Sequence, residues 1–523
     1  MPQRRTPHTR SHAAGGTART GRASSPGRAS HTKKNSAAAP KGVAHSVRSS
    51  AAPTVGNVRA GRADAPTRRV AEGSRAPKKL PLPGGYEMTL TRRHFLYGAA
   101  GVAAIAALGG GAAWAAGQTK DDDALHTLKV PEGAVTQSTS LEEMEDAAEA
   151  LTLTGSVELP FGSLVWCSDD AVAVCLLPTE IAKPLAQVGV IDLAAGTCTT
   201  VIEHAVGEDE GFEIYDVRGN SAGLIWTEAD ILDGVWRVFC ATLSGTTVGT
   251  PQLLDEGDAN WEMPTLAAAG GYGFWQCLPQ LDGNARVEDS LLKRAAFGTT
   301  DAEVVYASQG RMGCPPTSCG DSVVFAPRAR TNGTYYQVSH MNGATGRVTD
   351  AFVLPSSMKP MECGWGTTGL TFAFDGIYNY GDGIANLGTY LPMELPEDGA
   401  VSAEAADAAA AGDAPYLPVA DTAAGTEAYS AAPWFRFAST PLSAPCWCGN
   451  WVVARGSGWV LAVDLAGRRY AKLPLEEGSG DYNDFLASTH VGNRAVTYCN
   501  VDHTPIGGEQ KKCCLVRIWE PAS

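Results

Sequence analysis

Val188-Gly189-Val190-Ile191-Asp192 opens a stretch in which a turn at Gly196 leads to Thr199-Thr200-Val201-Ile202. The arrangement returns near the C-terminus as Val460-Leu461-Ala462-Val463-Asp464, Gly467 and Tyr470-Ala471-Lys472-Leu473. Each copy is an apolar strand ending in aspartate, a glycine turn and a second strand. The two copies predict repeated hairpin units in an all-β chain.

A short apolar run, often just after a glycine or aspartate, recurs along the chain. The runs begin at Ala171, Gly223, Gly273, Val323, Leu370, Trp451 and Ala495. The intervals between their first residues are 52, 50, 50, 47, 81 and 44. Apart from the long one, these intervals are typical of a four-stranded repeat of roughly 40 to 50 residues.

This pattern resembles the β-propeller fold, and the resemblance implies seven blades over residues 151–523. The long interval contains residues 394–433, rich in Ala, Glu, Asp and Pro, which we predict to be an inserted loop that adds no strands to the core. The last blade supplies only three strands, so we expect Leu151–Leu159 to close the ring as the fourth. No Trp-Asp, kelch or Asp-box signature indicates a named propeller family, and a pair of β-sandwiches is the alternative architecture.

A second motif, Thr91-Arg92-Arg93-His94-Phe95-Leu96, precedes a segment of mostly Ala and Gly that ends at Gly117. It resembles the twin-arginine export signal, Ser/Thr-Arg-Arg-x-Phe-Leu-Lys, with Tyr97 in place of the final lysine. The signal residues are Arg92, Arg93, Phe95 and Leu96, and Ala113 and Ala115 form an A-x-A cleavage site.

The resemblance implies that residues 88–117 are a signal, either cleaved or retained as a membrane anchor. The twin-arginine export machinery would then carry a folded bacterial protein across the cytoplasmic membrane, to be secreted or anchored. The alternative is a buried Ala-rich helix, or an ordinary membrane-spanning one. Glycines at 101 and 109–111 argue against a core helix, because each costs about 1 kcal/mol relative to alanine.

Residues 1–87 carry 17 Lys and Arg against Asp64, Glu72 and Glu87 and show no periodic apolar face. Such a segment cannot bury enough surface to become ordered, so we expect a disordered basic arm. The alternative is that translation starts at Met88. A real arm could lie against anionic lipid, touch nucleic acid nonspecifically, or have no partner.

The net charge of the rest of the chain is strongly negative. The chain as a whole carries −15 at pH 7, and setting aside the +14 of residues 1–87 together with Arg92 and Arg93 leaves −31 for residues 116–523. A body this acidic will not bind nucleic acid through its general field. Residues 118–138 are polar and predict a tether, and a capping box of Ser140 and Glu143 predicts a short helix through about Leu151.

Thirteen cysteines, all between Cys167 and Cys514, are many for a cytoplasmic protein, and an oxidising compartment would permit disulfides. We predict a local disulfide between Cys314 and Cys319. The cysteines in apolar runs are predicted to be small core residues: Cys175, Cys240, Cys277 and Cys499. Cys446, Cys448 and Cys363 could ligate zinc, but they lack C-x-x-C spacing.

No nucleophile elbow, phosphate-binding loop or dinucleotide fingerprint is present, and the sequence names no cofactor. Trp261, Trp365 and Trp434 lie outside the repeated runs and are the candidates for a ligand face. The first functional hypothesis is a non-enzymatic exported or anchored propeller that binds a protein, peptide or glycan. The second is an extracytoplasmic hydrolase or lyase that uses carboxylates in the central funnel.

Overall fold

The computed structural model describes most of the chain after residue 124. The described residues are 79–82, 86–89, 125–129, 135–181, 183–280, 290–329, 334–356, 358–374, 388–390, 423–431, 434–437, 441–456, 458–479, 484–504 and 508–523. The signal residues Arg92, Arg93, Phe95, Leu96, Ala113 and Ala115 lie outside them. Within the expected basic arm and the first residues after it, the structure describes one hairpin, β1 (Lys79–Leu82) and β2 (Tyr86–Thr89).

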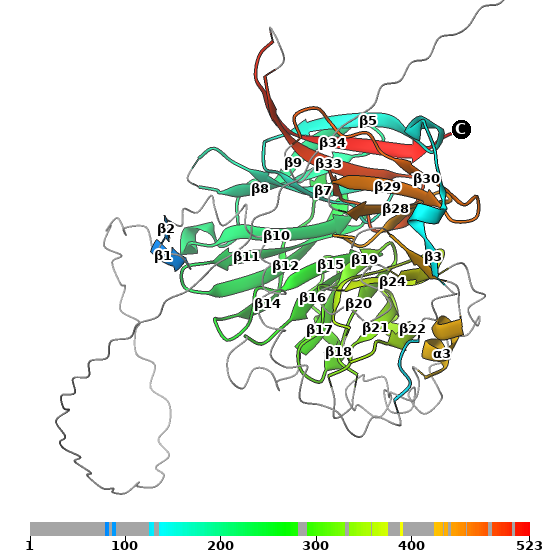
Figure 1. Ribbon diagram of the computed structural model, residues 1–523. Coiled ribbons are helices and arrows are strands. Elements are labelled where there is room, and N and C mark those ends of the chain that lie inside the picture. The colour runs from blue at the N-terminus through cyan, green and yellow to red at the C-terminus, as the bar shows by residue number, and fades with distance from the viewer. Residues whose placement is uncertain are drawn as a thin grey trace, which may run out of the picture. The chain divides into compact units, whose positions relative to one another are not determined.

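The described residues from 135 onward form seven successive sheets, each mainly antiparallel (Figure 1). Sheet 1 consists of β6 (Leu164–Trp166), β7 (Val172–Pro178), β8 (Ala186–Asp192) and β9 (Thr197–Ile202). Sheet 2 consists of β10 (Glu213–Asn220), β11 (Gly223–Asp230), β12 (Val235–Ser244) and β14 (Gln252–Gly257), with β13 (Thr247–Val248) beside β12. Sheet 3 consists of β15 (Thr265–Ala269), β16 (Tyr272–Cys277), β17 (Ser290–Ala296) and β18 (Glu303–Ser308).

The remaining sheets follow in chain order. Sheet 4 consists of β19 (Thr317–Cys319), β20 (Ser322–Phe325), β21 (Gln337–Asn342) and β22 (Arg347–Val353). Sheet 5 consists of β23 (Pro360–Gly366), β24 (Gly369–Phe374), β25 (Gly388–Tyr390), β26 (Trp434–Arg436) and β3 (Val135–Gln137). Sheet 6 consists of β27 (Cys446–Cys448), β28 (Trp451–Gly456), β29 (Trp459–Asp464) and β30 (Arg469–Lys472), flanked by β32 (Val491–Gly492) and β4 (Glu142–Glu143). Sheet 7 consists of β31 (Phe485–Leu486), β33 (Ala495–His503), β34 (Lys511–Pro521) and β5 (Leu151–Leu159).

Each of the seven apolar runs of the sequence is the second strand of one sheet. Its side chains are almost all buried, as in β7, β11 and β28. The core clusters combine residues of neighbouring sheets, so these strands are covered on both faces. A strand covered on both faces reads as a continuous apolar run rather than an alternating one.

Hydrogen bonds between turns join neighbouring sheets, and the last sheet returns to the first. The turns are those between the first and second strands of each sheet. Ser221 N donates to Asp169 of sheet 1 at 2.7 Å, and Asn493 N of sheet 7 donates to Asp170 of sheet 1 at 2.8 Å. Sheets packed in chain order and closed in this way have the arrangement of a β-propeller, not of stacked β-sandwiches.

The predicted pairing of Leu151–Leu159 in the last sheet is confirmed. β5 pairs antiparallel with β34 along its whole length, from Leu151 opposite Pro521 to Leu159 opposite Cys514. Figure 1 shows the cyan β5 beside the red β34. The N-terminal and C-terminal sides of the domain therefore share one sheet.

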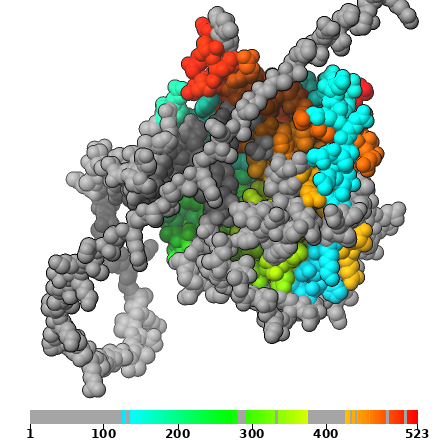
Figure 2. All heavy atoms as spheres, in the orientation of Figure 1, coloured from blue at the N-terminus to red at the C-terminus, as the bar shows by residue number. Residues whose placement is uncertain are grey.

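Residues 125–129 and 135–143, which we name the outer strap, lie along the outer edges of three sheets. Leu128 N donates to Val353 O of β22 at 2.7 Å, β3 pairs parallel with β26, and β4 pairs parallel with β30. In Figure 2 the cyan atoms of this region lie at the surface, against orange atoms of sheet 6 and near the amber atoms of helix α3. The strap supplies main-chain partners to edges that would otherwise be open.

The single helix expected from Ser140 to Leu151 is wrong. Two 3-10 turns, Ser138–Ser140 and Ala147–Glu149, flank β4 instead, and the Ser140 hydroxyl donates to Gln137 O rather than capping a helix. The unpaired edge of β30 favours an extended segment at this place, and Leu141 is buried against sheets 5 and 6.

Part of the expected insertion, residues 394–433, forms a helix, α3 (Ala423–Ala431). Thr426 accepts a hydrogen bond from Val353 N at 3.1 Å, and the fully buried Tyr429 donates its phenolic proton to Asp350. The helix and residue 128 therefore both hydrogen-bond to Val353 at the outer edge of β22. No helix in the described part of the chain is long and apolar enough to cross a membrane.

We expect Val157→Asp to lower the free energy of unfolding by about 3 kcal/mol or more, because it puts a charge into the closing strand at a position only 7% exposed. Urea denaturation measures this change. Ser156→Asp, exposed on the same strand, is the control and should stay within about 0.5 kcal/mol of the wild type. Equal losses in the two variants would contradict the role of β5 in closure.

Candidate functional site

The three tryptophans predicted for a ligand face lie in two separate core clusters. Trp261 packs at the core of sheets 2 and 3, whereas Trp365 and Trp434 pack together in a cluster of sheets 4 and 5. Trp365 stacks on His340 with ring centroids 4.2 Å apart. Trp434 is 3% exposed and donates its indole proton to Tyr429 O. The structure does not bring the three rings to one surface.

The predicted Cys314–Cys319 bridge is not formed, and all thirteen cysteines carry free thiols. Cys314 Sγ lies 3.6 Å from Cys363 Sγ, and Cys319 Sγ donates to Thr317 O. Cys446 and Cys448 are buried in β27. Among the residues that the structure describes, no group of three or more His, Cys, Asp or Glu side chains could hold a metal ion.

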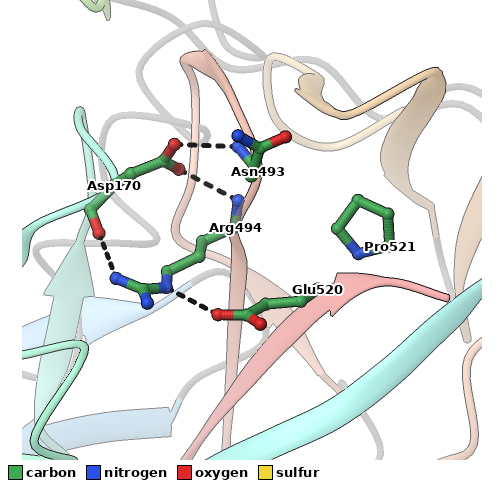
Figure 3. Close-up of a pocket in the computed structure, with 5 residues that line it drawn as sticks. All are labelled: Asp170, Asn493, Arg494, Glu520 and Pro521. Carbon is green, nitrogen blue, oxygen red and sulfur yellow. Dashed lines mark hydrogen bonds and ion pairs between the residues drawn. The ribbon is translucent and has the colours of Figure 1, made fainter. Parts of the chain in front are cut away.

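A surface pocket of about 420 Å³ lies where sheets 1 and 7 meet, lined by Asp170, Asn493, Arg494, Glu520 and Pro521 (Figure 3). The backbone amides of Asn493 and Arg494 donate to the Asp170 carboxylate at 2.8 and 2.9 Å. The Arg494 guanidinium donates to Asp170 O and to Glu520. The charges at the pocket are therefore paired with one another.

A buried histidine lies behind this pocket. His490 is 2% exposed, and its Nε2 lies 2.9 Å from Asp170 Oδ1. Burial by itself lowers the pKa of His490, but hydrogen bonds with Asp170 and Cys167 raise it to about 10. The imidazolium and the carboxylate thus form an ion pair between the last and first sheets. The residues around the pocket therefore join the last sheet to the first.

A different carboxylate, Glu362, stands apart from these paired groups. It lies on β23, the first strand of sheet 5, and its side chain is partly exposed. No hydrogen bond or ion pair within 4 Å joins it to another residue in the described ranges. Burial raises the pKa of Glu362 to about 7, although Arg455 lowers it. Glu362 is therefore divided between its two protonation states near neutral pH.

Arg455 connects this carboxylate to the last sheet. It lies at the end of β28, its Nε donates to Asp484 O at 2.9 Å, and its guanidinium lies 4.2 Å above the Phe485 ring. Phe485 stacks in turn on Tyr498, with ring centroids 5.0 Å apart. Burial lowers the pKa of Arg455 and raises that of Tyr498.

We call Glu362, Arg455, Phe485 and Tyr498 the acid–arginine site. Its members come from neighbouring sheets 5, 6 and 7, in which β23 contacts β27, and β27 and β28 contact β33 and β31, respectively. A carboxyl group with a pKa near 7 can both give and take a proton at neutral pH. A neighbouring guanidinium can stabilise negative charge on a bound group. The site therefore carries the parts needed for proton transfer to an anionic or polarised ligand.

Other buried carboxylates have direct partners. Burial raises the pKa of Asp350 to about 6, but Asp350 accepts a hydrogen bond from Tyr429. Asp484 forms a buried ion pair with Arg517. Glu228 accepts hydrogen bonds from Val206 N, Gly207 N and the Trp226 indole. The hydrogen bonds and ion pair of these groups stabilise loops and sheets, whereas Glu362 forms no such interaction with the described residues.

Sequence reasoning missed this site. The available signal was a charge inside an apolar strand: Glu362 follows Pro360 and Met361, and Arg455 ends the run that begins at Trp451. Nothing in the linear sequence brings residues 93 positions apart to one place, because the contact depends on the order of sheets around the ring.

No protein-family model matches the chain, and no curated protein is similar to it in sequence. Among solved structures, it is similar to a prolyl endopeptidase at a TM-score of 0.42 and 11% identity, covering 84% of this chain and 56% of that one. An oligogalacturonate lyase in complex with manganese gives 0.37 and 9%, with 69% and 89% covered. The β-propeller domain of the Trilobed protease from Pyrococcus furiosus gives 0.38 and 9%, with 68% and 97% covered.

The chain thus spans about half the length of the prolyl endopeptidase that it matches. At these TM-scores the likenesses carry no argument about function. The propeller arrangement rests on the sheet order and the closing hydrogen bonds described above.

We expect Glu362→Gln to raise the free energy of unfolding at pH 8 by up to about 3 kcal/mol. The folded-state pKa of Glu362 is raised from 4.5 to about 7, so its favourable contribution is complete below pH 4.5 and is lost as pH rises through 7. Urea denaturation at pH 5 and pH 8 measures the effect. A wild type and a variant with the same pH dependence between 4.5 and 7 would contradict the raised pKa.

Proposed function

We propose that this chain is an extracytoplasmic, seven-bladed propeller enzyme, a hydrolase or lyase, that uses Glu362 as its proton-transferring group. The observation that carries the proposal is a carboxyl group on the first strand of sheet 5 that has a raised pKa and no direct partner among the described residues. Perturbed titratable groups of this kind cluster at functional sites. The substrate is held in the funnel where the first strands of sheets 5, 6 and 7 meet.

In this mechanism Glu362 exchanges a proton with the substrate, and Arg455 stabilises the negative charge that develops. Asp484 O and the Phe485 ring hold the guanidinium in place, so little reorganisation accompanies the reaction. Phe485 and Tyr498 form the apolar wall behind it. The chain's own residues thus supply acid–base and electrostatic catalysis, which together suit hydrolysis or elimination.

Export through the twin-arginine machinery belongs to the same proposal and rests on Arg92, Arg93, Phe95 and Leu96. The alternative, a propeller that only binds a protein, peptide or glycan, rested on Trp261, Trp365 and Trp434. The burial of Trp434 and the separation of the three rings do not favour it.

The activity test screens the purified protein against polyuronates, neutral oligosaccharides, peptides and esters. We expect a rate for at least one class with an ionisation near pH 7, and a loss of about 100-fold or more in Glu362→Gln. Asp209→Asn, at an exposed position, is the control and should leave the rate unchanged. Turnover that is indifferent to Glu362→Gln, or a screen with no turnover, would overturn the enzymatic proposal.

The export test combines cell fractionation with N-terminal sequencing of the native protein. We expect extracytoplasmic material, either beginning after Ala115 or retaining the signal as an anchor. Replacing Arg92 and Arg93 with lysine should leave the protein in the cytosol. Native protein found in the cytosol with both arginines intact would contradict export.

A further inference from the structure

We propose that Cys175 and Cys198 form a two-coordinate thiolate site for a soft cation, Cu(I), near the outer edge of sheet 1. The two sulfurs lie 3.7 Å apart. Cys175 is on β7 and Cys198 on β9, and β8 runs between them. This site is separate from the acid–arginine site and does not depend on the proposed function.

Gly189 on β8 makes room for the two sulfurs. It lies opposite Cys175 in the sheet, and its neighbour two residues on, Ile191, lies opposite Cys198. All four positions therefore share one face. A Cβ at Gly189 would lie 2.7 Å from Cys175 Sγ and 3.0 Å from Cys198 Sγ. The missing side chain lets the two thiols meet across the strand that separates them.

The pair cannot close into a disulfide without moving the backbone. Adjacent strands lie about 4.7 to 4.9 Å apart, so strands on either side of a third are separated by roughly 9 to 10 Å. Disulfides need Cα atoms within about 6.8 Å. The two sulfurs are thus close enough to bind one metal ion, whereas the strands are too far apart for a disulfide. The two cysteines therefore do not form a disulfide with each other in an oxidising compartment, and their sulfurs stay able to bind a metal ion.

The two thiols form a hydrogen bond with each other. A hydrogen bond with Cys175 lowers the pKa of Cys198, and the same bond, together with burial, raises the pKa of Cys175. Binding of Cu(I) to the two thiols forms two copper–sulfur bonds, breaks both S–H bonds and releases the two protons to water. No electron is transferred, because copper enters and stays as Cu(I).

The number of ligands selects the cation. Thiolates bind soft ions such as Cu(I) and Zn²⁺, but protein zinc sites take four ligands. No set of three or more ligating side chains occurs in the described residues, so this pair offers only two. Cu(I) is stable with two thiolates, and a linear arrangement requires the two sulfurs to move slightly apart from their 3.7 Å separation. Cys198 is partly exposed on the outermost strand of the sheet, which gives the ion a route to the buried Cys175.

The test titrates the purified protein with Cu(I) under anaerobic conditions, in competition with bicinchoninate. We expect one tightly bound Cu(I) per chain and release of the thiol protons on binding, up to two per copper. Cys198→Ser and Cys175→Ser should each weaken binding by about 100-fold or more, since one thiolate is left. Cys240→Ser, which removes another core thiol on sheet 2, is the matched control and should leave binding unchanged.

Gly189→Ala tests the geometry, because it keeps both thiols but fills the space between them. We expect weaker Cu(I) binding in this variant, with far-ultraviolet circular dichroism confirming that it folds. X-ray absorption of the copper-loaded wild type should show two sulfur neighbours. Binding that survives both Cys175→Ser and Cys198→Ser, or a native Cys175–Cys198 disulfide found by mass spectrometry, would overturn the proposal.

Discussion

The pairing of β5 with β34 is the contact on which the rest of the structure depends. A series of sheets that pack in chain order has two free ends, and each end exposes both apolar side chains and unpaired backbone groups. Here one sheet receives three strands from the C-terminal end and one from residues 151–159. The hydrogen bonds along this pair tie the ends together. The packing of sheet 7 against sheet 1 then completes the core.

The same requirement explains the segments outside the ring. The outer strap and helix α3 provide hydrogen-bond partners for the outer edges of sheets 4, 5 and 6. Val353 binds both segments: its amide donates to Thr426 of the helix, and its carbonyl accepts from Leu128 of the strap. Sheets 1 to 3 end instead at β9, β14 and β18, beyond which no further strand is paired in the described residues. Within the described residues, the added segments therefore pair with the outer edges of sheets 4 to 6 and not with those of sheets 1 to 3.

Charged groups between the sheets fall into two kinds. One kind is hydrogen-bonded by donors from neighbouring segments, as are Asp170, Asp484 and Glu228. These bonds offset the free-energy cost of burying a charge. Glu362 is only partly exposed and has no direct donor among the described residues, so its charged form is disfavoured. Because Glu362 must ionise at high pH without a direct donor, it lowers the free energy of unfolding there. A carboxyl group without a direct partner can exchange its proton with a ligand. For this reason we assign the proposed function to the acid–arginine site and not to the pocket of Asp170, where the charges are paired.

The sequence by itself determined the local elements. The seven apolar runs marked the second strands because a strand covered on both faces must be apolar throughout, and the count of strands in the last repeat indicated that Leu151–Leu159 had to return. The capping box at Ser140 failed because short-range helix signals are weak beside an open sheet edge that needs a partner. Only the tertiary structure decided which distant residues meet. Asp170 contacts His490, Cys175 meets Cys198 across Gly189, and the charge of Arg455 acts on Glu362. The order, twist and closure of the sheets set these pairs, and no linear spacing encodes them.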